Sequence, residues 1–178
     1  QTLEAMRDTM KHGGPDSEGM YVDKVLPLAL GHRRLSILDL SEAGHQPMYC
    51  KYWVMVYNGE IFNFKEVRAL LEAEGYDFQT ETDTEVILKA FKAWGMEMVQ
   101  HFRGFFAFAI FNNQTKRLTI VRDRLGVKPL YWYWKDGLFL FASELKAFHQ
   151  HPAFDKTISK KAVSCLLYTS DAADDTCC

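Results

Sequence analysis

An apolar run from Gly104 to Phe111 carries the strongest constraint on the fold of this chain. It reads Gly-Phe-Phe-Ala-Phe-Ala-Ile-Phe, so positions of both parities are hydrophobic. Successive side chains of a strand point to opposite faces, and a strand of this composition is therefore covered on both. Asn112–Gln114 predict a turn and Leu118–Arg122 a returning strand, which together place an antiparallel pair inside a layered structure.

Helices and short strands are predicted around this pair. Residues 1–11 show helical spacing, 12–16 break it, and 19–58 are typical of strands and loops. Two helices follow, Phe64–Glu74 and Asp83–Trp94, with N-caps predicted at Asn63 and Thr82. The remaining expected elements are a hairpin and a short helix: Leu130–Trp134 with Leu138–Ala142, and a helix capped by Ser143 that runs through Phe148. The order predicts an α+β fold of packed sheets with helices outside.

Composition narrows the class of protein. A chain of 178 residues can bury one sizeable core, which favours one domain. The formal net charge of -2 gives no general attraction for nucleic acid or anionic lipid, and no apolar run is long enough to predict a membrane span. The four cysteines (Cys50, Cys165, Cys177 and Cys178) fit neither a metal site nor a disulfide framework, which favours a cytoplasmic location. We expect no metal in this chain.

Three polar segments are the candidate functional residues. They are His32-Arg33-Arg34-Leu35-Ser36-Ile37, Tyr57-Asn58-Gly59-Glu60-Ile61 and Thr82-Asp83-Thr84-Glu85. Each also has a simpler interpretation. Asn58-Gly59 is typical of a hairpin turn, Asp83 favours a helix N-terminus, and Arg34 is compatible with an ordinary surface ion pair.

The order and intervals of these segments resemble the class II glutamine amidotransferase domain at the N-terminus of asparagine synthetases. Further segments carry the same resemblance, which covers roughly residues 2 to 164: His12–Asp16, Gly44–Met48, Arg103–Ala109, Arg122–Tyr131 and Ala142–Ala147. The resemblance implies an N-terminal-nucleophile-hydrolase-like, four-layer αββα sandwich of two mainly antiparallel sheets. It also divides the chain into an amidotransferase domain, residues 1–165, and a tail, 166–178, outside the family pattern.

By this resemblance the substrate is L-glutamine. Arg34 is expected to hold its α-carboxylate and Asp83 its α-amino group, with Leu35, Ser36 and Ile37 completing the clamp. Asn58 and Gly59 are expected to form the oxyanion hole, and Glu60 lines the pocket. The family's nucleophile is an N-terminal cysteine whose own α-amine is the base.

Two departures from the family pattern stand out. Residue 1 is Gln1, so we assign no nucleophile and expect this chain to be inactive as written. Cys50 lies between motifs and is interpreted as a bystander. Gly13 stands where the family has arginine, which removes a positive charge near the pocket.

The resemblance implies that a C-terminal synthetase domain of the parent protein binds ATP and Mg²⁺ and receives the ammonia; no cofactor is expected in these residues. The sequence leaves open whether the protein forms a homodimer. Two alternative functions also stay open: an amidotransferase domain that serves another acceptor, such as a sugar phosphate, and a binding module without a nucleophile.

Overall fold

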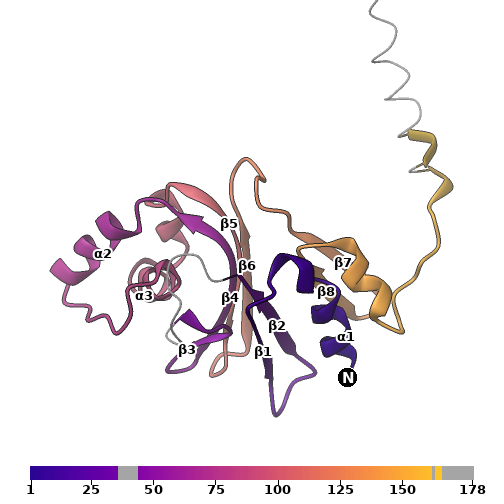
Figure 1. The fold of residues 1–178 in the computed structure, drawn as a ribbon, viewed down its shortest axis with the longest axis horizontal. Helices are drawn as coiled ribbons and strands as arrows, with labels where there is room; N and C mark the ends of the chain where they lie inside the picture. The colour runs from indigo at the N-terminus through magenta and orange to yellow at the C-terminus, as the bar shows by residue number, and fades with distance from the viewer. Residues whose placement is uncertain (36–43, 162, 166–178) are drawn as a thin grey trace, which may run out of the picture.

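The computed structural model describes residues 1–35, 44–161 and 163–165. Its centre is a four-stranded antiparallel sheet with the order β3-β4-β5-β6 (Figure 1). The strands are β3 (Met48–Cys50), β4 (Trp53–Ile61), β5 (Gly104–Asn112) and β6 (Arg117–Arg122). The tail predicted for 166–178 lies outside the described residues, as do Ser36 and Ile37.

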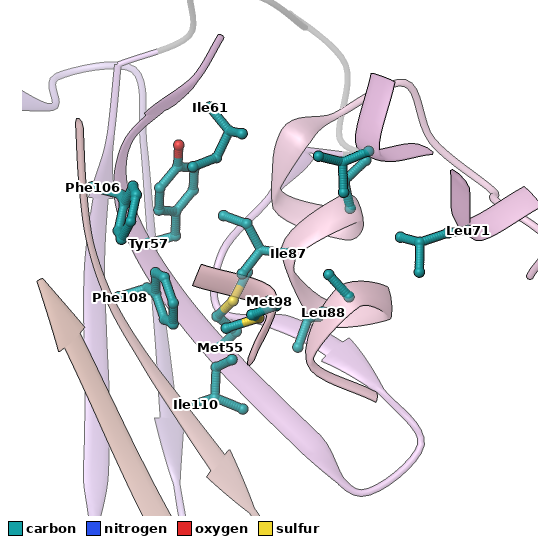
Figure 2. Close-up of a cluster of buried hydrophobic side chains, with 13 residues drawn as sticks. Met55, Tyr57, Ile61, Leu71, Ile87, Leu88, Met98, Phe106, Phe108 and Ile110 are labelled. Carbon is teal, nitrogen blue, oxygen red and sulfur yellow. The ribbon is translucent and has the colours of Figure 1, made fainter. Parts of the chain in front are cut away.

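One face of this sheet packs against helices. These are α2 (Phe64–Ala73), α3 (Asp83–Trp94) and the 3₁₀ helix η3 (Gly95–Gln100). Figure 2 shows Phe106, Phe108 and Ile110 of β5 facing the apolar side chains of α3 and η3. Because Ile87 and Met98 have no measurable exposure, this layer is a closed core.

Two hairpins cover the other face. They are β1 (Ser17–Val22) with β2 (Ala29–Arg34), and β7 (Tyr131–Lys135) with β8 (Leu138–Ala142). Outside them lie α1 (Thr2–Asp8), η1 (Lys11–Gly13) and η4 (Leu145–Gln150), and α1 contacts both β2 and η4 (Figure 1). The layers are therefore helices, sheet, hairpins and helices, but the second strand layer consists of two separate hairpins.

The structure confirms that β5 is covered on both faces. Its even-numbered side chains join the core under α3, whereas Ala109 and Phe111 join a second cluster with Leu30 of β2 and Val54 of β4. All side chains from Phe106 to Phe111 are at most 5% exposed. Hydrophobic residues occupy both odd and even positions of β5 because the two faces of this strand belong to two distinct cores.

Local capping was predicted less well. The Thr82 hydroxyl accepts a hydrogen bond from the Glu85 N–H at 3.3 Å, as expected of an N-cap. Asn63 precedes α2 but makes no cap bond; its side chain instead bonds His101 O and Arg103 N. The prediction of Ser143 as a cap is wrong, because η4 begins at Leu145 with Glu144 in the N-cap position.

Adjacent glycines at the end of η1, Gly13 and Gly14, are expected to respond in opposite ways to alanine. A β-carbon on Gly13 would meet no atom within 4 Å, whereas one on Gly14 would lie 2.6 Å from the Arg33 carbonyl carbon. Gly13→Ala should stabilise the fold by about 0.4–1 kcal/mol through the unfolded state. Gly14→Ala should destabilise it by about 1–3 kcal/mol through the clash. Urea unfolding of both variants tests this; equal free energies of unfolding would contradict the loop packing.

Candidate functional site

A cavity of about 390 Å³ lies where the carboxyl ends of β2 and β4 meet the start of α3. Segments distant in sequence close it, including Gly13, Gly44, Lys128, Ser143 and Glu144. Side chains of both charges line this cavity. The basic ones include Arg34 and Lys128, and the acidic ones are Glu60, Asp83 and Glu144. Such a surface suits a small ligand that carries both charges.

Most of the predicted site residues border this cavity. The structure brings together Arg34, Leu35, Asn58, Gly59, Glu60 and Asp83. The remaining two, Ser36 and Ile37, directly follow Leu35 but lie outside the described residues. Residues from β2, β4 and α3 thus converge on one space although they are up to 49 positions apart, from Arg34 to Asp83.

The position of the Arg34 guanidinium depends on Gly44. A β-carbon on Gly44 would lie 2.2 Å from Nη2 of Arg34 and 2.8 Å from its Cζ. Because Gly44 has no side chain, the Arg34 guanidinium can occupy this space. The sequence marked Gly44 only as part of a motif, because nothing local to a loop shows which distant side chain packs against it.

Asp83 is the first residue of α3 and is held by β4. Its Oδ2 accepts hydrogen bonds from the Tyr57 hydroxyl at 2.7 Å and the Ile61 N–H at 3.2 Å. Burial raises the pKa of the Asp83 carboxyl above its usual value, although these hydrogen bonds act in the opposite direction. Arg34 and Asp83, which carry opposite charges, both line this cavity.

Asn58 and Gly59 lie inside β4, so the hairpin-turn interpretation is wrong. They pair with Ala107 and Phe106 of β5. Gly59 has a φ of 149°, and a β-carbon there would lie 2.2 Å from Phe105 O. This conformation requires glycine. The Asn58 amide donates a long hydrogen bond of 3.4 Å to Ser143 Oγ, at the point where β8 ends.

Two residues from the family-like segments, Gln46 and His32, hold β4 beside Asn58. The buried Gln46 side chain accepts a hydrogen bond from the Tyr57 N–H at 2.6 Å. His32 Nε2 lies 2.9 Å from Tyr57 O, and a carbonyl can only accept, so Nε2 carries the proton. Burial lowers the pKa of His32 to about 4, which keeps the ring neutral near pH 7. The only sequence signal was their position within the family-like segments.

A buried carboxylate positions Lys128 at the cavity. Asp123 accepts hydrogen bonds from the N–H groups of Val127 and Lys128, both at 2.8 Å, and from that of Phe106. Burial opposes ionisation, yet the backbone donors bring the pKa of Asp123 below its usual value. The loop 123–128 is therefore fixed by its own aspartate, and Lys128 was missed because the sequence gives no direction for its side chain.

Other reactive side chains lie elsewhere. Among residues 1–35, 44–161 and 163–165, Cys50 is on β3 and Cys165 is exposed near the end of the described chain, and neither lines the cavity. The same residues contain no group of three or more His, Cys, Asp or Glu side chains that could hold a metal ion. None of their helices is long and apolar enough to cross a bilayer.

The comparison with protein families shows the class of protein to which this layered fold belongs. The glutamine amidotransferase domain model matches residues 1–178, so the chain belongs to that family. The fold is also that of a solved enzyme: glutamine phosphoribosylpyrophosphate amidotransferase from Bacillus subtilis, complexed with ADP and GMP. That structure aligns with a TM-score of 0.59 at 25% identity, covering 68% of this chain and 28% of the other.

Within the family, the chain is similar to asparagine synthetases. It is 37% identical to asparagine synthetase [glutamine-hydrolyzing] 3 of Bacillus subtilis, over 92% of this chain and 27% of the relative. It is 43% identical to asparagine synthetase B [glutamine-hydrolyzing] of Escherichia coli, over 83% of this chain and 26% of the relative. The chain therefore spans about a quarter of these relatives and corresponds to their glutamine amidotransferase domain.

Proposed function

We propose that the cavity binds L-glutamine as the glutaminase site of an asparagine-synthetase-like enzyme. The observation that carries this proposal is that Arg34 and Asp83, which carry opposite charges, line one cavity. A free amino acid has a carboxylate and an ammonium group on one carbon. A guanidinium binds the first and a carboxylate the second, which leaves the side-chain amide to point toward the other cavity residues.

We infer that Asn58 and Gly59, which also line this cavity, act on that amide. A thiolate that attacks the side-chain carbonyl carbon moves the C=O electron pair onto oxygen, and donors at this point stabilise the charge. When the C–N bond breaks, nitrogen takes a proton and leaves as ammonia, and water then hydrolyses the thioester to glutamate. Asn58 offers an amide N–H and Gly59 a backbone N–H to this oxyanion.

The full-length protein would supply the nucleophile and the ammonia acceptor. By similarity to asparagine synthetases, a C-terminal domain of the same chain would bind ATP and Mg²⁺ and pass ammonia to activated aspartate. We place this protein in the cytoplasm because the spacing of the four cysteines in its sequence does not fit a disulfide framework.

Replacing Arg34 by alanine is expected to raise KM for glutamine in the full-length protein by about 10- to 100-fold. The reason is loss of charge-assisted hydrogen bonds of about 1.5–3 kcal/mol that serve ground state and transition state alike. Gly44→Ala should raise KM in the same direction by displacing the guanidinium. The exposed Arg117 supplies the control, since Arg117→Ala should leave KM unchanged. A normal KM in Arg34→Ala would remove its assigned role.

As the pH falls, glutamine binding should weaken at a higher pH than it would if the binding carboxylate had the pKa of an ordinary aspartate. Asp83 must be ionised to bind the ammonium group, and burial raises its pKa, so protonation begins earlier as the pH falls. Calorimetric titration of this chain with glutamine between about pH 4 and 7 measures the effect. Because His32 also titrates near 4, the Asp83→Asn variant is the control. Asp83→Asn should bind weakly at every pH; an unchanged pH dependence in that variant would contradict the assignment.

A further inference from the structure

Tyr57 connects the two ends of the candidate site. It directly precedes Asn58 on β4, and it lines the cavity that we propose to bind glutamine. Its backbone N–H donates to Gln46 Oε1 at 2.6 Å, and its backbone oxygen accepts from His32 Nε2 at 2.9 Å. Its hydroxyl donates to Asp83 Oδ2 at 2.7 Å. Tyr57 therefore bonds three segments that are distant in sequence, through both backbone groups and the side chain.

The hydroxyl of Tyr57 is held in one position by the core. Tyr57 is 5% exposed and belongs to the hydrophobic cluster under α3. Figure 2 shows it among these side chains, with its hydroxyl directed toward the Ile61 end of β4. The Ile61 N–H donates to the same Oδ2 of Asp83 at 3.2 Å. Because the ring is packed on β4, the two donors of this strand hold one carboxylate oxygen in a fixed place.

The Asp83 carboxylate keeps room for a ligand. Its two oxygens offer about four acceptor positions. Tyr57 and Ile61 use Oδ2, and the backbone N–H of Thr84 also bonds the carboxylate. These three donors leave about one acceptor position, and Asp83 lines the cavity. An ammonium group in the cavity can therefore donate to the position that β4 leaves.

The charge on Asp83 is a balance between burial and these donors. Burial raises the pKa of Asp83, and the nearby carboxylate of Glu60 acts in the same direction. Among the groups that lower this pKa, the Tyr57 hydroxyl has the largest effect. The other ionisable residues that line the cavity are His32, Arg33, Arg34, Lys128 and Glu144.

We propose that Tyr57 is a positioning residue for glutamine: its hydroxyl keeps Asp83 ionised and oriented so that the remaining acceptor position receives the ammonium group of the ligand. This role rests on the proposed function. Tyr57 acts through Asp83 and not on the reacting amide. Because Tyr57 directly precedes Asn58, one short stretch of β4 fixes both the carboxylate that binds the ammonium group and the proposed oxyanion donor.

Tyr57→Phe tests the effect on binding, because it removes the hydroxyl and keeps the ring and both backbone hydrogen bonds. Calorimetric titration of the 178-residue chain with L-glutamine should show an affinity about tenfold lower at pH 7. As the pH falls, the variant should lose the remaining affinity at a higher pH than the unmodified chain does, because Asp83 without this donor is protonated more readily. An unchanged affinity and pH dependence would overturn the proposal.

Tyr21 supplies the matched control. Its hydroxyl donates at 2.9 Å to Asp23, a buried carboxylate that does not line the cavity. Tyr21→Phe removes an equivalent hydrogen bond and should leave the affinity for glutamine and its pH dependence unchanged. Equal losses of affinity in Tyr21→Phe and Tyr57→Phe would show that a general loosening of the fold weakens binding, which would contradict a specific role for Tyr57.

A measurement without ligand separates this proposal from the proposed function. Carbon-13 NMR of the Asp83 carboxyl carbon, followed against pH, measures the pKa of this group. Tyr57→Phe should raise that pKa, whereas Tyr21→Phe should not change it. An unchanged pKa in Tyr57→Phe would refute the proposal, whatever the affinity for glutamine. A raised pKa in a chain that does not bind glutamine would support the action of the hydroxyl on Asp83 and count against the proposed function alone.

The unmodified chain provides a second test that does not depend on the folding of any variant. The ring carbon of Tyr57 that bears the hydroxyl should change its carbon-13 shift with the same midpoint pH as the Asp83 carboxyl carbon, because the hydrogen bond joins the two groups. A Tyr57 shift that does not follow the protonation of Asp83 would contradict the proposal.

Discussion

Asn58→Ala is expected to lower kcat for glutamine hydrolysis in the full-length protein by about 100- to 1000-fold. The amide of Asn58 lies on β4 beside Gly59 and has only a 3.4 Å hydrogen bond to Ser143 within the described structure. It therefore has donor capacity left for an oxyanion. Because this charge exists only in the transition state, KM should change little.

The control for this prediction is Asn113→Ala in the exposed turn after β5, which should leave both constants unchanged. Steady-state ammonia release, measured over a range of glutamine concentrations, separates kcat from KM. A large rise in KM with normal kcat in Asn58→Ala would show that this side chain binds the ground state, and the oxyanion assignment would be wrong.

Phe108→Ala is expected to destabilise the chain by about 3–5 kcal/mol. Phe108 is 2% exposed, stacks on Phe106 with ring centroids 5.7 Å apart, and faces α3 in the core of Figure 2. Truncation would leave a cavity between the sheet and the helices that neither layer can close without moving the other.

The matched variant is Phe62→Ala, because Phe62 is 60% exposed at the end of β4. Phe62→Ala should lower the free energy of unfolding by less than about 1 kcal/mol. Urea unfolding gives both free energies, and the two midpoints should differ clearly. Similar losses in Phe62→Ala and Phe108→Ala would contradict the assignment of the central core to the α3 face of β5.

The sequence predicted the central sheet well because its signal is dense and local. Residues 104–111 are apolar on both parities, and only a strand between two cores suits that pattern. Asn58-Gly59 misleads as an isolated dipeptide. These two residues do not form a turn, because β4 and β5 pair over nine residues and include them. Gly59 has a positive φ within this pairing and lies close to the backbone of Phe105.

Features that depend on long-range contacts escaped prediction. The hydrogen bond between Tyr57 and Asp83 spans 26 positions, and the Arg34 guanidinium packs against Gly44, which lies ten positions further along the chain. Ser143 shows the same limit, because a residue typical of a helix cap lies instead beside Asn58. The family resemblance included Gln46, His32 and Lys128 in its segments, but their contacts at the cavity required the three-dimensional structure.

Titration of the 178-residue chain with L-glutamine tests the central claim most directly. Isothermal calorimetry of the unmodified chain should show one glutamine per chain. Arg34→Ala should weaken that binding by about tenfold or more, with an unchanged melting temperature, and Arg117→Ala should bind as the unmodified chain does. Absence of binding, or equal binding by a folded Arg34→Ala variant, would contradict the assignment of this cavity to glutamine.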